Sequence, residues 1–128
     1  MEEYEELYNK ALRYMNSYDL KNYNIKKAKE LMQQIADDGY LCGYCYMYVF
    51  AVIDENEEEK TKWINNVKKV DMVLADNLIV RCDIDGDEYK DAIRRLKSIN
   101  FSYFNGLDYL NTYFRKHGSD LEVNKDEK

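Results

Sequence analysis

The chain has 128 residues, the size of one domain, and 45% of them are hydrophobic, so it can bury a core and is not intrinsically disordered. Its net charge of −6 argues against binding to a phosphate backbone, which requires a basic surface. The sequence contains no proline, so no helix is interrupted, and this favours an all-α fold over turn-rich sandwiches and barrels.

The start of the chain and its cysteines indicate the compartment. Residues 1–6 are acidic, where a secretory leader is basic and then apolar. The longest apolar run, residues 40–53, is shorter than the roughly 20 residues that span a membrane. An odd number of cysteines, 3, is typical of reduced thiols. We expect a cytoplasmic protein that contacts neither membrane nor nucleic acid directly.

Hydrophobic spacing divides the chain into about seven helical segments, of which the first two are amphipathic. They cover residues 3–18 and 24–38, with apolar side chains recurring every three or four positions. Asn24 is expected to cap the second segment, because its side chain can accept hydrogen bonds from free backbone amides. Gly39 is expected to end it, since glycine tolerates the left-handed conformation that follows a helix.

The third segment, residues 40–53, is apolar on nearly every side and should be the most buried element. Its tyrosine, valine, phenylalanine and isoleucine content also suits a strand. The run is long for a strand and its neighbours are helical, so a helix is favoured.

Capping signals mark the fourth and fifth segments. Asn56 and Glu59 have the spacing of a capping box, in which each side chain binds the other residue's backbone amide. The helix that follows extends to Val70, and its last turn is basic, as suits the helix dipole. Asp71 is expected to cap the fifth segment, whose apolar stripe ends at Cys82.

The sixth and seventh segments complete the domain. Asp85 and Glu88 form a second capping box for the sixth segment, over residues 87–99. The seventh covers residues 101–117 and ends at Gly118. We therefore expect one helical domain over residues 1–118 and a flexible polar tail over 119–128. Short connections make consecutive helices antiparallel, and the product is a row of helix hairpins.

A weak internal repeat accompanies the hairpins. Lys27, Lys60 and Lys90 each open the second helix of a hairpin, at intervals of roughly thirty residues. Two-helix repeats of this length are typical of helical solenoids. The fold expected is thus all-α, a short α-solenoid of antiparallel hairpins, with a compact helical bundle as the alternative.

Residues 27–48 resemble the tetratricopeptide-like repeat families, and most of all the Sel-type repeats. The resemblance lies in Lys27-Ala28, Leu31, Ala36-Asp37-Asp38-Gly39 and the tyrosines from Tyr44 to Tyr48. The later units follow only the helix rhythm: the family's leucine–glycine pair is not matched, and no later unit ends in Ala-x-x-Gly. The resemblance implies a scaffold for protein–protein interaction and names no partner.

Cys42 and Cys45 form a Cys-x-x-Cys pair, which at a helix start can exchange thiol for disulfide. Thioredoxin-like enzymes that use this pair also need a preceding strand and a cis-proline, and this chain has no proline. We therefore expect both thiols to be small core residues, with a redox or metal enzyme as a minor alternative.

The metal-site patterns are incomplete. A zinc site drawn from Cys42, Cys45, Cys82 and His117 lacks the second close ligand pair. Counted from Asp83 as a calcium loop, Gly86 comes too early and Arg94 stands where the last acidic ligand belongs. No phosphate loop, Gly-x-Ser-x-Gly or His-Glu-x-x-His occurs either. We expect no catalytic residues, no metal and no cofactor.

The prediction of a protein-binding surface rests on the 13 tyrosines. Tyrosine is enriched in interface hot spots, although half-buried packing also explains such residues. The first helices of the hairpins, which line the concave face of a solenoid, are rich in tyrosine, whereas the second helices hold most of the lysines and arginines. We expect a peptide or helix of another protein to contact six residues of this face: Tyr44, Tyr48, Asn77, Arg81, Tyr109 and Tyr113.

Size and acidity allow a second function. The chain could act as a small acidic inhibitor, of the phage anti-defence or immunity type, that blocks a basic nucleic-acid-binding partner. Such binding weakens sharply with salt, whereas binding centred on tyrosines changes little.

Overall fold

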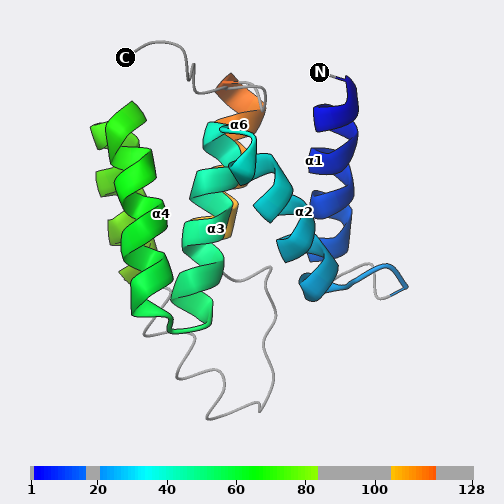
Figure 1. Ribbon diagram of the computed structural model, residues 1–128, viewed down its shortest axis with the longest axis horizontal. Helices are drawn as coiled ribbons and strands as arrows, with labels where there is room; N and C mark the ends of the chain where they lie inside the picture. Colours follow the sequence, from blue (N-terminus) through cyan, green and yellow to red (C-terminus); the bar gives the residue numbers. More distant parts are fainter. Residues whose placement is uncertain (1, 17–20, 84–104, 118–128) are drawn as a thin grey trace.

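The computed structural model describes residues 2–16, 21–83 and 105–117, and in these residues the ordered structure is helical, with no strand. Helices and their bounds are α1 (Glu2–Met15), α2 (Ile25–Asp37), α3 (Leu41–Ile53), α4 (Glu57–Val70), a helix over residues 72–83, and α6 (Asn105–His117) (Figure 1). The all-helical prediction is thus confirmed, and the segment over 40–53 is a helix rather than a strand. Outside the described residues lie the predicted sixth segment, its Asp85–Glu88 capping box, the stop at Gly118 and the tail over 119–128.

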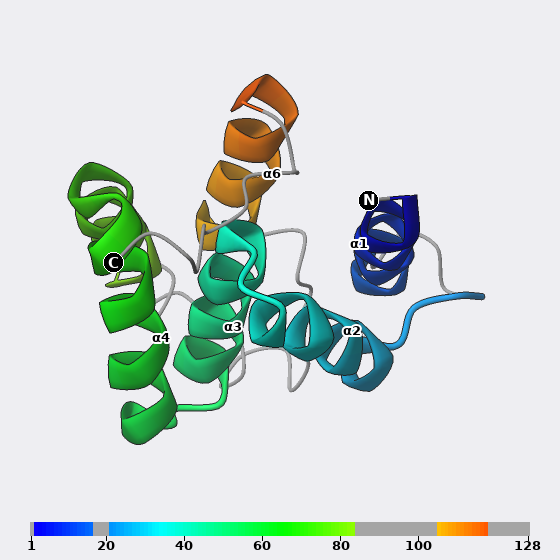
Figure 2. The same cartoon turned by 45° about the horizontal axis from the view of Figure 1, so that its top comes forward.

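Helix α3 occupies the centre of the arrangement. Consecutive helices from α1 to α4 pack against one another and alternate in direction (Figure 1). Helices α2 and α4 lie on the two flanks of α3, and α6 packs against a third face of α3, behind it in the view of Figure 1 (see also Figure 2). Among the described helices, none has both the length and the apolar composition that crossing a bilayer demands.

Three predicted helix caps are present. The side chain of Asn24 accepts a hydrogen bond from the Lys27 backbone amide at 3.1 Å, and Asn56 accepts from the Glu59 amide at the same distance. Asp71 caps the 72–83 helix by accepting from the Leu74 amide at 3.0 Å. Each such cap stabilises its helix by about 1 kcal/mol.

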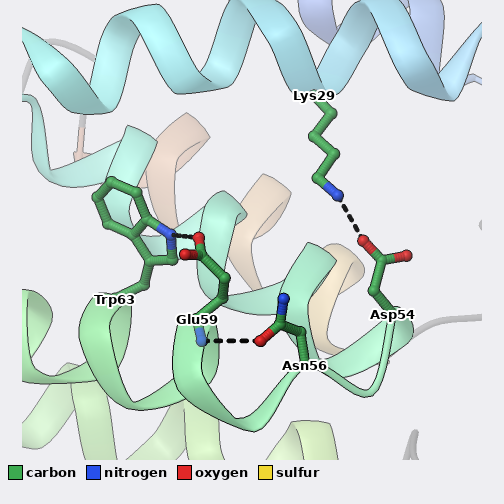
Figure 3. Close-up of polar contacts among 5 residues, drawn as sticks. All are labelled: Lys29, Asp54, Asn56, Glu59 and Trp63. Atoms are coloured by element: carbon green, nitrogen blue, oxygen red, sulfur yellow. Dashed lines mark hydrogen bonds and ion pairs between the residues drawn. The ribbon is translucent and has the colours of Figure 1, made fainter.

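The other hydrogen bond predicted for this capping box, from the Asn56 backbone amide to the Glu59 side chain, is not formed. The Glu59 carboxylate accepts a hydrogen bond from the indole Nε1 of Trp63 at 2.9 Å instead of returning to Asn56 (Figure 3). The Asn56 amide is already engaged, because it donates to the Ala51 carbonyl at 3.0 Å and closes the end of α3. Figure 3 also shows the ion pair between Lys29 and Asp54 that links α2 to this turn.

Helices α2 and α3 end in the same way. Gly39 follows α2 with φ of 90°, as predicted, and the Tyr40 amide donates to the Ile35 carbonyl at 3.2 Å. After α3 the left-handed residue is Glu55, with φ of 55°. This backward hydrogen bond over a left-handed residue is the Schellman motif, which usually takes glycine at that position.

Burial of α3 is nearly complete. All of its residues are buried except Tyr44 and Val52. Gly43 lies where α3 meets the backbone of α2: a Cβ added there would be 2.4 Å from the Ala36 nitrogen. The two helices can approach this closely only because residue 43 has no side chain.

Candidate protein-interaction site

Helix α6 docks on α3 through two apolar anchors one turn apart. Leu110 is 0% exposed and Phe114 is 2% exposed. The Phe114 ring stacks on the fully buried ring of Tyr46 in α3, with 6.3 Å between centroids. Burying a large apolar side chain contributes about 1.5–3 kcal/mol, so these two anchors together stabilise the docked helix by roughly 3–6 kcal/mol before the entropy of ordering it is counted.

Two successive hydrogen bonds connect Tyr8 of α1, Tyr46 of α3 and Asn111 of α6. The Tyr46 hydroxyl donates to the side-chain oxygen of Asn111 in α6. Because this bond uses the only hydroxyl hydrogen of Tyr46, the Tyr8 hydroxyl of α1 is the donor in its own 3.4 Å contact with Tyr46. Burial raises the pKa of Tyr8 to about 12 and raises the pKa of Tyr46 well above its ordinary value. Both groups therefore remain protonated donors at neutral pH.

The opposite edge of α6 meets the 72–83 helix. The guanidinium carbon of Arg81 lies 4.7 Å from the centroid of the Tyr109 ring, a cation–π contact. Tyr109 and Tyr113, one turn apart, have ring centroids 6.3 Å apart, and both rings are half-buried. Arg81 is exposed, as is Asn77, which precedes it by one turn on the same side of its helix. We call these four residues, Asn77, Arg81, Tyr109 and Tyr113, the composite surface.

The other two predicted contact residues lie elsewhere. Tyr48 is only 3% exposed, and burial raises its pKa, so it packs in the core and presents no ring to a partner in this structure. Its helix is buried on nearly all sides, so Tyr48 does not lie on an exposed concave face. Tyr44 is half-buried and stacks on Trp63 of α4, with centroids 5.9 Å apart. It therefore belongs to the α3–α4 contact.

Two residues that shape the site were not predicted, Tyr46 and Asn111. Tyr46 lies in the apolar run over residues 40–53, where no charged residue marks a buried or an exposed side, so hydrophobic spacing does not distinguish it from its neighbours. Asn111 did carry a signal, because it directly follows the apolar stripe position Leu110, at the edge of a buried face.

The thiols of the Cys-x-x-Cys pair lie in the core. Cys42 and Cys45 are both 0% exposed, and the Tyr4 hydroxyl contacts the Cys42 sulfur at 2.9 Å. Burial raises the pKa of Cys45 well above its ordinary value, so its thiol stays protonated at neutral pH, whereas thiol exchange needs a thiolate. In the part of the chain that the structure describes, no group of three or more His, Cys, Asp or Glu side chains is placed to hold a metal ion.

Comparison of the chain with protein-family models, with curated protein sequences and with solved structures finds no match.

Proposed function

We propose that this protein is a non-enzymatic interaction module that binds a peptide or helix of another protein on the composite surface. The observation that supports it most is that exposed Arg81 and half-buried Tyr109, two of the six predicted contact residues, meet from two separate helices, with exposed Asn77 and half-buried Tyr113 each one turn away along the same helices. Arginine and tyrosine dominate binding hot spots, because they combine large contact area with directional hydrogen bonding.

The architecture is consistent with this proposal. Helices α1–α2 and α3–α4 form two consecutive antiparallel hairpins, and we propose them as the first two units of a short, tetratricopeptide-like solenoid. Helices α1 and α3 would then be the inner helices of that solenoid. Because α6 packs on α3, one of these proposed inner helices, the composite surface would stand on the inner, ligand-binding side.

The first test is a pull-down. The tagged full chain is passed through a lysate of its own source at low and at moderate salt, and retained proteins are identified by mass spectrometry. Arg81→Ala and Tyr109→Ala should each weaken binding of the retained partner about 30-fold or more, the loss of about 2 kcal/mol or more expected for a hot-spot residue.

Lys62→Ala is the matched control for this experiment. Lys62 is exposed and lies 4.5 Å from the Trp63 ring, so its removal deletes the same kind of cation–ring contact on a different helix. Capture by this variant should equal that of the wild type. Equal capture by all three variants would place the binding site elsewhere on the protein.

The same salt series tests the acidic-inhibitor alternative. A nucleic-acid-binding protein that is retained at low salt and lost at moderate salt, with no dependence on Arg81 or Tyr109, would replace the present proposal with that one.

A further inference from the structure

Helix α6 contributes half of the composite surface, yet its described anchors are few. Among the α6 side chains whose burial the structure describes, residues 109–116, Leu110 and Phe114 are buried and Tyr109 and Tyr113 are half-buried, whereas α3 is buried along nearly its whole length. A helix that buries less of its described surface than the central helix opens locally at a lower free energy. The Arg81–Tyr109 pair exists only while α6 is docked.

The two edges of α6 have different bonding. On a helical wheel, Asn111 flanks the Leu110–Phe114 stripe on one side, and Tyr109 and Tyr113 flank it on the other. Apolar contacts are non-directional and leave the helix free to rotate and slide. The hydrogen bond from Tyr46 to Asn111 is directional, and it joins the fully buried hydroxyl of the central helix to one edge of α6.

We propose that α6 docks as a separate unit and that Tyr46 is its positioning residue: by binding Asn111, Tyr46 sets the rotation of α6 and so places Tyr109 beneath Arg81. This makes the interaction surface conditional on a bond that lies outside it. The proposal rests on the proposed function only in treating that surface as a binding site.

The test uses the isotope-labelled full chain without any partner, so its outcome is independent of whether a partner is found. Two signals are read by NMR: the ring-current shift that Tyr109 imposes on the Arg81 side chain, and the exchange rates of backbone amide hydrogens in α6 and α3. In the wild type, α6 amides should exchange at least tenfold faster than α3 amides.

Tyr46→Phe removes the hydroxyl and keeps the ring. We expect the Arg81 shift to fall by at least half and α6 amides to exchange about 5- to 10-fold faster, as loss of one hydrogen bond implies, with α3 exchange unchanged. Tyr8→Phe is the control: it deletes the neighbouring hydroxyl and leaves the Tyr46–Asn111 bond, so both signals should stay at their wild-type values.

If Tyr46→Phe does not fold, substitutions of Asn111, the exposed partner in the same hydrogen bond, test the positioning role instead. Asn111→Asp keeps an acceptor and should retain the Arg81 shift, whereas Asn111→Leu should lose it. An Arg81 shift that survives both Tyr46→Phe and Asn111→Leu would overturn the positioning role. Exchange of α6 and α3 at the same rate in the wild type would overturn separate docking.

Discussion

Glu55 holds a backbone conformation that suits glycine better. Its φ of 55° lies in the left-handed region, where the Cβ of an L-residue crowds the following carbonyl oxygen at a cost of about 1–2 kcal/mol. Gly39 occupies the equivalent position after α2 and carries no such cost. The turn at Glu55 persists because the Asn56 amide bonds back to Ala51 and the Asn56 side chain caps α4.

Glu55→Gly should therefore stabilise the protein. Relief of the left-handed strain exceeds the extra chain entropy of glycine, and we expect a net gain of about 0.5–1 kcal/mol in the free energy of unfolding. Urea denaturation followed by circular dichroism measures it. Glu58→Gly makes the same chemical change inside the first turn of α4, where it should instead cost about 0.5–1 kcal/mol. Equal losses in both variants would show that Glu55 is not strained.

At the scale of elements, the sequence predicted the helix caps, because each cap depends on residues only three positions apart. Asn24, Asn56 and Asp71 cap helices because a side-chain oxygen reaches an amide three residues on, a relation visible in sequence. Contacts between distant elements were not predictable in this way. Tyr46 and Asn111 are 65 residues apart, and Gly43 reads as an ordinary helix residue until α2 is placed against it. Tyr48 was predicted on the concave, partner-binding face, but it is buried with nearly all of α3.

Gly43 sets the distance between α2 and α3. A methyl group at this position would meet the Ala36 nitrogen and Cα at 2.4 and 2.6 Å, and these backbone atoms can move only with the whole helix. We expect Gly43→Ala to lower the free energy of unfolding by about 2–3 kcal/mol, despite the better helix propensity of alanine. Urea denaturation reports this directly. Asn65→Ala, at an exposed position of α4, should change stability by less than about 0.5 kcal/mol, and a similarly small effect at Gly43 would contradict the close approach.

Across the whole molecule, tyrosines join the first hairpin to the second. The rings of Tyr4 and Tyr40 stack with centroids 3.9 Å apart, and Tyr8 meets Tyr46 edge-on at 6.1 Å. These contacts link α1 directly to the start and middle of α3. They place phenol groups in a core that excludes their ionised form, so the packing of the hairpins depends on those groups staying protonated.

Alkaline pH should therefore destabilise the fold. Burial raises the pKa of Tyr8 from 10.0 to about 12, so below pH 10 its contribution to stability is fully present. Above pH 10 the unfolded chain releases this proton while the folded chain retains it, and stability falls until the folded group ionises near pH 12. For Tyr8 alone the loss approaches about 1.4 kcal/mol per pH unit, and Tyr46 adds to it in the same direction.

Urea midpoints at pH 8, 10, 11 and 11.5 should decline steeply above pH 10 in the wild type. The decline should be shallower in Tyr8→Phe, because this variant has one phenol fewer to ionise. Parallel declines in the two proteins would mean that Tyr8 ionises as easily in the folded core as in the unfolded chain.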